Sequence, residues 1–218
     1  MSTTNTGSLN SSSLKQQAYE ELKQMILSGE LPAGTMLSVR QLADRLSMSR
    51  TPIHAAIERL EVDGVVTLAP QQGVVIREVS LEDIRNHYEI RQAIEPYVMR
   101  RLAGQLTKDQ IRQLRENQAE NVEATRSQSV DAVVAVDAEF HRLLISFLGN
   151  RDMIELMQRL RERIQFVVYR LLQRTPDRMC KSSDEHNEIL QALIDGDGDR
   201  AAALMHEHLD AGLRRFLH

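Results

Sequence analysis

Four side chains in the C-terminal half of the sequence are of types that bind divalent metal ions. Asp137 and His141 lie four residues apart, so on a helix they share one face, and their neighbours on that face are apolar. His186 and His208 lie among apolar residues in two later segments, so all four are expected to point inward. Because burying polar groups without partners is costly, the pattern predicts a divalent cation held by three imidazoles and one carboxylate. Zinc is the first candidate, and manganese, nickel and iron are alternatives.

Each histidine taken alone has a simpler explanation, which is a hydrogen-bonded histidine in a helical core. A metal-free bundle with structural histidines is therefore one alternative. A helical metallohydrolase is another, although the sequence has no HExxH motif and no spare carboxylate at an obvious spacing for a general base. His206, two residues from His208, is expected to point elsewhere.

A second group of side chains is of the kind that contacts DNA. The segment from Arg50 to Leu60 has helical periodicity, with an apolar side formed by Ile53, Ala56, Ile57 and Leu60. Its polar side consists of Arg50, Thr51, His54 and Glu58. Ser49 is a suitable N-cap, and Pro52 is tolerated in the first turn. A shorter helix is expected before this segment, starting after Ser38. The two helices together predict a helix-turn-helix whose second helix offers its polar side to a DNA groove. An ordinary helical hairpin is the alternative.

Local signals predict the elements that must position these side chains. Capping boxes are formed by three pairs: Ser38 with Gln41, Ser80 with Asp83, and Thr107 with Gln110. A first helix is expected from Leu14 to about Ser28. Two β-branched runs, Val65–Leu68 and Val74–Arg77, predict a hairpin around the turn at 69–73. Six helices are expected after Ser80, at about 81–104, 108–126, 130–148, 151–174, 177–195 and 199–217.

These elements predict a mainly α protein. Residues 1–13 are polar and are expected to be a disordered tail. Residues 14–78 are expected to form a winged helix-turn-helix DNA-binding domain with three helices and a β-hairpin wing. Residues 79–218 are expected to form an all-α antiparallel helical bundle that binds an effector and dimerises.

Composition and charge add limits. The chain has 218 residues and no tryptophan, which suits packed helices. It has one cysteine, which excludes an internal disulfide framework and suits a reducing cytoplasm. No apolar run approaches the ~18 residues that span a bilayer, and no signal peptide is recognised, so no membrane association is expected. The net charge is −4, without the basic footprint of many DNA-binding proteins. We therefore expect a modest, salt-sensitive DNA affinity that depends on dimerisation.

The stretch LSVRQLADRLSMSRTPIHAAIERLEVDGVV, followed by QQGVVI, resembles the winged helix-turn-helix of GntR-type bacterial transcription regulators. The SRTP of Ser49 to Pro52 and the RLEVDGVV of Arg59 to Val66 are the main matches. The resemblance implies DNA contacts by Arg40, Ser49, Arg50, Thr51, His54 and the wing-tip Gly73.

Three positions depart from that family's pattern. Ser47 replaces the usual glycine of the turn between the helices, Val39 replaces an acidic residue, and His54 with Ala55 replaces an Arg-Glu pair. Histidine cannot make the bidentate guanine contact that arginine makes. The operator sequence of a typical relative therefore does not transfer to this chain.

The second half also has a family resemblance. DAEFHRLLISFLGN, DEHNEILQALIDGD and DRAAALMHEHL resemble the effector-binding domain of the FadR-like subfamily. Its metal-binding members use one acidic residue and three histidines, at positions that match Asp137, His141, His186 and His208. Arg91 matches an arginine that helps to hold a carboxylate effector near the metal, and a guanidinium beside a metal is suited to that role. The alternative for Arg91 is a surface ion pair with Glu95.

Together these features predict a homodimeric cytoplasmic transcription regulator, more a repressor than an activator, and not an enzyme. It is expected to bind a pseudo-palindromic operator in duplex DNA and to respond to a small organic acid bound next to the metal. The alternative regulator senses the metal itself and has no organic effector.

Overall fold

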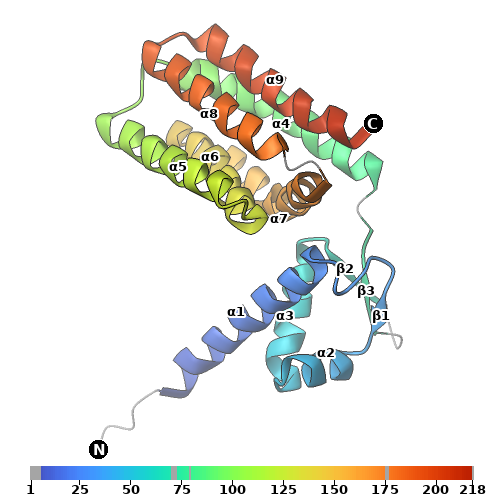
Figure 1. Ribbon diagram of the computed structural model, residues 1–218. Coiled ribbons are helices and arrows are strands. Elements are labelled where there is room, and N and C mark those ends of the chain that lie inside the picture. Colours follow the sequence, from blue (N-terminus) through green and yellow to red (C-terminus); the bar gives the residue numbers. More distant parts are fainter. Residues whose placement is uncertain (1–5, 70–72, 79, 175–176, 218) are drawn as a thin grey trace, which may run out of the picture. The chain divides into compact units, whose positions relative to one another are not determined.

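The computed structural model describes residues 6–69, 73–78, 80–174 and 177–217 (Figure 1). Contacts divide the chain into two units, Met1–Glu78 and Val79–His218. The first unit contains α1 (Thr6–Leu27), β1 (Met36–Leu37), α2 (Val39–Leu46), α3 (Arg50–Val62), β2 (Val66–Ala69) and β3 (Gly73–Ile76). The second contains α4 (Leu81–Leu102), α5 (Lys108–Arg126), α6 (Val130–Leu148), α7 (Arg151–Arg174), α8 (Asp177–Asp195) and α9 (Gly198–Leu217). The predicted mainly α fold is confirmed.

The helix-turn-helix of α2 and α3 is confirmed together with the apolar side that positions it. The four residues of that side are at most 1 % exposed and are Ile53, Ala56, Ile57 and Leu60. They pack against α1, whose Ala18, Leu22 and Ile26 are equally buried. Ser38 begins α2 with the predicted capping box. Burial of one side of α3 leaves its polar side free to face solvent.

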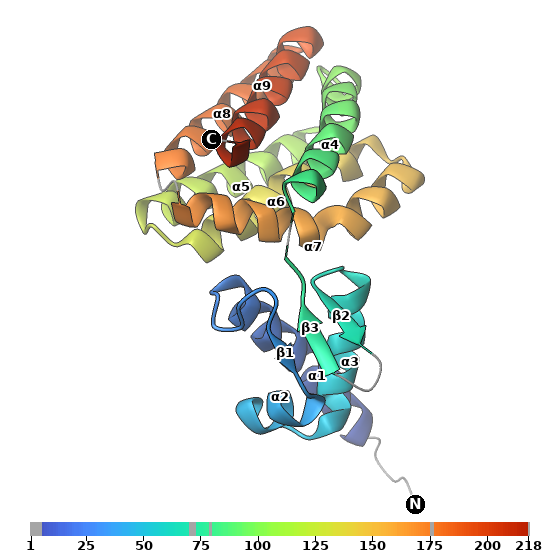
Figure 2. The same ribbon diagram turned by 90° about the vertical axis from the view of Figure 1, so that its right-hand side faces the viewer.

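Three strands form an antiparallel sheet in the order β1-β3-β2 (Figure 2). The β2–β3 hairpin was predicted, and it pairs Val66 with Ile76 and Leu68 with Val74. The rest of its predicted turn, residues 70–72, lies outside the described residues. Strand β1 was not predicted, because two residues show no periodicity. A Cβ at Gly73 (φ +124°) would lie 2.5 Å from the carbonyl oxygen of Leu37, so glycine is needed for β1 and β3 to approach.

The expectation of a disordered tail over residues 1–13 is wrong for residues 6–13, which are helical. Helix α1 begins at Thr6 rather than at Leu14. Adding turns to an existing helix costs less free energy than nucleating a new one. The later part of α1 packs against α3, so the polar Ser/Thr/Asn stretch before it can continue the same helix. Residues 1–5 lie outside the described part of the chain.

The turn between α2 and α3 has the backbone conformation that favours glycine. Ser47 ends α2 with φ 53° and ψ 36°, in the left-handed region. We expect Ser47→Gly to raise the free energy of unfolding by about 0.5–1 kcal/mol, because the strain of a Cβ at positive φ is removed. Urea unfolding measures the change. Ser49→Gly is the matched control, since φ is −68° at Ser49, and a stability gain equal in both variants would contradict the explanation.

The six helices of the second unit agree with the predicted ranges within two residues. Ser80 and Thr107 form the predicted capping boxes of α4 and α5. Helices α4 and α9 lie side by side, and α5, α6, α7 and α8 pack with them around one core (Figures 1 and 2). Phe140 of α6 and Ile189 and Leu193 of α8 are fully buried in that core. In the part of the chain that the structure describes, no helix is long and apolar enough to cross a membrane.

Candidate functional site

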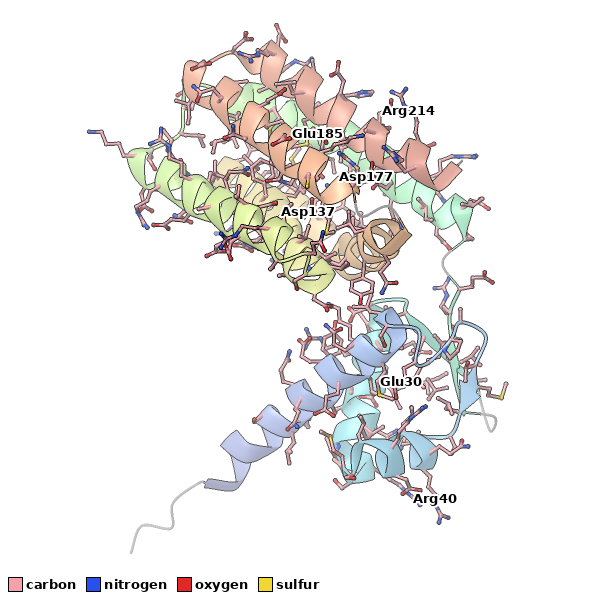
Figure 3. The ribbon with its side chains drawn as sticks, in the orientation of Figure 1. Glu30, Arg40, Asp137, Asp177, Glu185 and Arg214 are labelled. Carbon is pink, nitrogen blue, oxygen red and sulfur yellow. The ribbon has the colours of Figure 1, made fainter. Side chains whose placement is uncertain are left out.

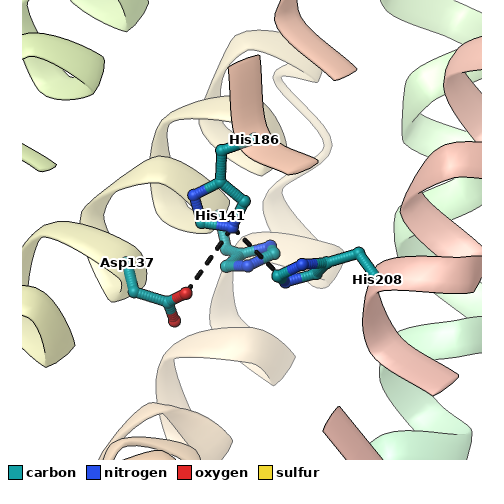
Figure 4. A group of neighbouring side chains, drawn as sticks. All are labelled: Asp137, His141, His186 and His208. Carbon is teal, nitrogen blue, oxygen red and sulfur yellow. Dashed lines mark hydrogen bonds and ion pairs between the residues drawn. The ribbon is translucent and has the colours of Figure 1, made fainter. Parts of the chain in front are cut away.

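The four predicted metal ligands converge inside the second unit (Figure 4). Asp137 and His141 come from α6, His186 from α8 and His208 from α9. All four are buried, with 0–7 % of each residue exposed. One ligand atom from each lies within 4.8 Å of the others. The structure therefore brings the four side chains to one place in the core of the second unit.

The separations fit a single divalent cation. His186 Nε2 lies 3.3 Å from His208 Nε2 and 3.5 Å from Asp137 Oδ1. Two ligands that each bond a cation at about 2.1 Å lie about 3.0–3.4 Å apart at angles of 90–110°. His141 Nε2 is buried and has no hydrogen-bond partner among the described residues, so it is available as a ligand.

The outer nitrogens of two histidines bind carboxylates that sequence reasoning missed. His141 Nδ1 lies 2.6 Å from Glu95 Oε2, and His208 Nδ1 lies 2.7 Å from Glu185 Oε2. Arg178 binds both oxygens of Glu185, at 2.7 and 2.5 Å. The only sequence signal was local: Glu185 directly precedes His186, and Glu95 lies four residues after Arg91. In the Glu95–His141 and Glu185–His208 contacts the two residues are 46 and 23 positions apart in the sequence. Helical periodicity does not predict contacts between residues of different helices.

Electrostatics favours neutral imidazoles at His186 and His208. Burial holds the pKa of His186 well below its usual value, and the neighbouring His208 and His141 lower it further. Burial also lowers the pKa of His208, although Glu185 opposes the shift. Burial would raise the pKa of Glu95, but Arg91 and His141 outweigh it and lower that pKa below the usual value. Neutral imidazole is the form of histidine that binds metals.

Arg91 of α4 is buried rather than on the surface, which corrects one expectation. Only 2 % of the residue is exposed, and its Nε donates to Glu95 Oε1 at 2.7 Å. The ion pair between Arg91 and Glu95 was predicted correctly, but it lies in the core beside the histidines and not on the surface. Burial tends to lower the pKa of Arg91, but Glu95 outweighs it and raises that pKa. A buried, charged guanidinium beside the cluster is suited to an anionic ligand.

Of the pockets that reach the cluster, two are lined by both Arg91 and Asp137. The larger has a volume of about 570 Å³ including its open mouth, and His141 also lines it. Its remaining wall is mainly apolar and includes Ala138, Ile145, Ile154, Met157 and Ile164. The smaller pocket, about 340 Å³, is lined by Arg178, Ser182, His208 and Tyr88 among others. Burial raises the pKa of Tyr88 to about 12, so its hydroxyl remains a donor.

The six candidate DNA-contact residues all belong to the first unit. Five are exposed: Arg40, Ser49, Arg50, Thr51 and His54, while Gly73 at the start of β3 is half-buried. Figure 3 shows Arg40 projecting outward from α2. Ser49 stands at the N-cap position of α3, as predicted, but its side chain makes no capping hydrogen bond. Its hydroxyl and the first turn of α3 are therefore free to bind a phosphate.

Comparisons with known proteins match both units. Residues 14–76 match the model for bacterial regulatory proteins of the gntR family, and residues 86–211 match the FCD domain. The HTH-type transcriptional repressor RspR of Escherichia coli (strain K12) is 30 % identical over 199 residues, which cover 90 % of this chain and 86 % of that protein.

Solved structures show the same fold. A GntR transcriptional regulator from Rhodococcus sp. RHA1 aligns over 94 % of this chain and 98 % of its own, with TM-score 0.77 and 22 % identity. McbR/YncC from E. coli aligns over 94 % of this chain and 99 % of its own, with TM-score 0.76 and 22 % identity.

Proposed function

This chain belongs to the GntR family of bacterial regulatory proteins and has an FCD domain, and on that premise we propose that it is a repressor controlled by a small acid bound beside a metal ion. The family is one of DNA-binding transcription regulators, so the metallohydrolase alternative has no support from it. Repression is proposed because the E. coli relative at 30 % identity is named a repressor.

The observation that most supports a metal is the arrangement of four ligand atoms within 4.8 Å in a buried site. Asp137, His141, His186 and His208 would hold the ion. Two of the histidines have their Nδ1 atoms bound to carboxylates, so their Nε2 lone pairs are directed to the cluster. A divalent cation there, with zinc the first candidate, would offer a Lewis-acidic position to an anionic ligand.

The larger pocket supports an organic acid as the effector. Arg91 and His141 lie at the polar part of the pocket, and Ile145, Ile154 and Met157 belong to its apolar part. A carboxylate would bind the polar part, and a carbon body would contact the apolar part. Such a ligand buries apolar area while its charge is compensated by the guanidinium.

The first unit supports DNA binding through the polar side of α3. Arg50, Thr51 and His54 would face the major groove, with Arg40 and Ser49 on the phosphates and the strand pair at Gly73 toward the next minor groove. We propose that two chains form a homodimer on a pseudo-palindromic operator. Effector binding would change operator affinity by favouring one of two dimer geometries.

The test uses a duplex that the protein itself selects from a random double-stranded pool. The zinc-loaded and chelator-treated proteins are screened by thermal shift against a panel of carboxylic acids that includes hexanoate, benzoate, citrate and gluconate. We expect at least one acid to raise the melting temperature only when zinc is bound, and the same acid to lower affinity for the duplex several-fold. Effector control would be contradicted if the affinity for the duplex were the same with and without every acid that binds the protein.

The metal-sensing alternative makes a different prediction for the same experiment. If the cation is the signal, zinc alone changes duplex affinity, and no acid on the panel changes it further. Titrating zinc without any acid therefore separates the two regulators.

A further inference from the structure

We propose that Glu95 and Glu185, neither of them a ligand candidate, are positioning residues that orient His141 and His208 toward the metal. The inference rests on the proposed metal site. Each glutamate would hold the Nδ1–H of one imidazole and thereby direct its Nε2 lone pair into the cluster. The roles follow from two Arg–Glu–His chains that reach the cluster from different helices.

The first chain links Arg91, Glu95 and His141. Arg91 Nε donates to Glu95 Oε1 at 2.7 Å, and Glu95 Oε2 lies 2.6 Å from His141 Nδ1. A carboxylate paired with a guanidinium is ionised and has only acceptor sites, so His141 Nδ1 must be the donor. In this tautomer the lone pair of the ring is on Nε2, the atom that is buried without a partner among the described residues.

The second chain links Arg178, Glu185 and His208. Arg178 binds Glu185 through both terminal nitrogens, and Glu185 Oε2 lies 2.7 Å from His208 Nδ1. Arg178 Nη2 also lies 3.4 Å from His208 Nδ1, but it donates to Glu185 Oε2 at 2.5 Å and to the His208 carbonyl oxygen at 3.3 Å. The nearer partner of Nδ1 is therefore the ionised Glu185, which makes Nδ1 the donor and leaves the lone pair of His208 on Nε2, 3.3 Å from His186 Nε2. Side-chain exposure is 5 % for Arg178 and 31 % for Glu185, so this chain extends from the core toward the surface.

His186 is held in another way and provides an internal comparison. Its Nδ1 is buried and has no hydrogen-bond partner among the described residues. Its ring instead stacks on Phe140, with centroids 4.1 Å apart and planes at 14°. Removing a glutamate should therefore alter His141 or His208 but leave the ring orientation of His186 unchanged.

The test replaces Glu185, which is the more exposed of the two glutamates. Glu185→Leu removes the acceptor, and Glu185→Gln keeps an acceptor but loses the charge. Outer hydrogen bonds of this kind typically contribute about 10–100-fold to metal affinity. We expect the Kd for zinc, measured by chelator competition, to rise at least about tenfold in Glu185→Leu and by less in Glu185→Gln. Glu188→Leu, at an exposed position on the same helix, is the control.

A second readout separates orientation from stability and needs no metal. Long-range ¹H–¹⁵N spectra of the metal-free protein report which ring nitrogen of each histidine is protonated. We expect the Nδ1–H form of His208 in the parent and a mixture of tautomers in Glu185→Leu, with His141 unchanged. Glu95→Gln should affect His141 in the same way and leave His208 alone.

A double variant keeps the result interpretable. Glu185→Leu leaves Arg178 buried without its carboxylate partner, so Arg178→Met/Glu185→Leu is measured as well. Unchanged zinc affinity and unchanged tautomers in a folded Glu185 variant would overturn the proposal. If the parent binds no zinc, the proposed metal site fails, whereas the tautomer spectra still test the positioning role by themselves.

Discussion

Replacing His186 by alanine is expected to abolish most of the stabilisation that zinc would provide at the proposed metal site. A cation that binds only the native state stabilises it by about 2.7 kcal/mol when its concentration is 100 times the dissociation constant. His186 is 0 % exposed, and its Nε2 faces two other ligand candidates at 3.3 and 3.5 Å. The variant would lose one of the four proposed ligands, which are brought together only in the folded protein, so its zinc-dependent gain in stability should fall close to zero.

The measurement compares the free energy of unfolding with zinc and with a chelator, within each variant. Taking the difference within one variant removes the effect of the cavity that alanine leaves beside Phe140. His206→Ala is the matched control, because His206 is an exposed histidine two residues from His208 on the same helix. Equal zinc-dependent gains in the parent, His186→Ala and His206→Ala would mean that the cluster is a structural, metal-free core.

Replacing Arg50 by alanine is expected to weaken binding to the selected duplex by at least about 1 kcal/mol, or roughly fivefold, at fixed salt. Arg50 is exposed at the first position of α3, beside an N-cap serine whose hydroxyl makes no capping bond. A guanidinium there can bind a guanine edge or a phosphate. The fold should be unaffected, because the apolar side of α3 lies opposite.

Fluorescence anisotropy with the selected duplex measures this change. Arg45→Ala is the control: it removes the same charge from the last turn of α2, where Arg45 faces Glu30 at 3.4 Å. A sequence-independent charge effect would weaken both variants alike and would lower the salt dependence of binding in both. If Arg50→Ala binds as the parent does, α3 is not the helix that contacts DNA.

The elements were predictable because their signals are local. Capping boxes at Ser38, Ser80 and Thr107 lie within four consecutive residues, and each was found where predicted. Gly149 ends α6 in the left-handed conformation, directly after the predicted end of this helix at about residue 148. Strand β1 and the start of α1 were not predicted, because neither has a local signal. Strand β1 has only two residues, and the first turns of α1 are a polar stretch that continues into the predicted helix.

The candidate metal ligands were predictable for a related reason. Helical periodicity determines which side of its own helix a residue occupies, so four polar residues among apolar neighbours had to be buried. Periodicity does not determine which side chain of another helix stands opposite. For that reason the contacts of Glu95, Arg178 and Glu185 with the histidines were missed, although Glu95 was named as a partner of Arg91.

The sequence by itself determined the helices, the inward direction of three histidines and an aspartate, and the exposed polar side of α3. Only the tertiary structure decided that Arg91 is buried, that two glutamates bind the Nδ1 atoms, and that His186 stacks on Phe140. The reason is physical. Hydrogen bonds and turns within a segment depend on neighbouring residues, whereas contacts between helices depend on how the whole bundle packs, and this arises from many small apolar contacts at once.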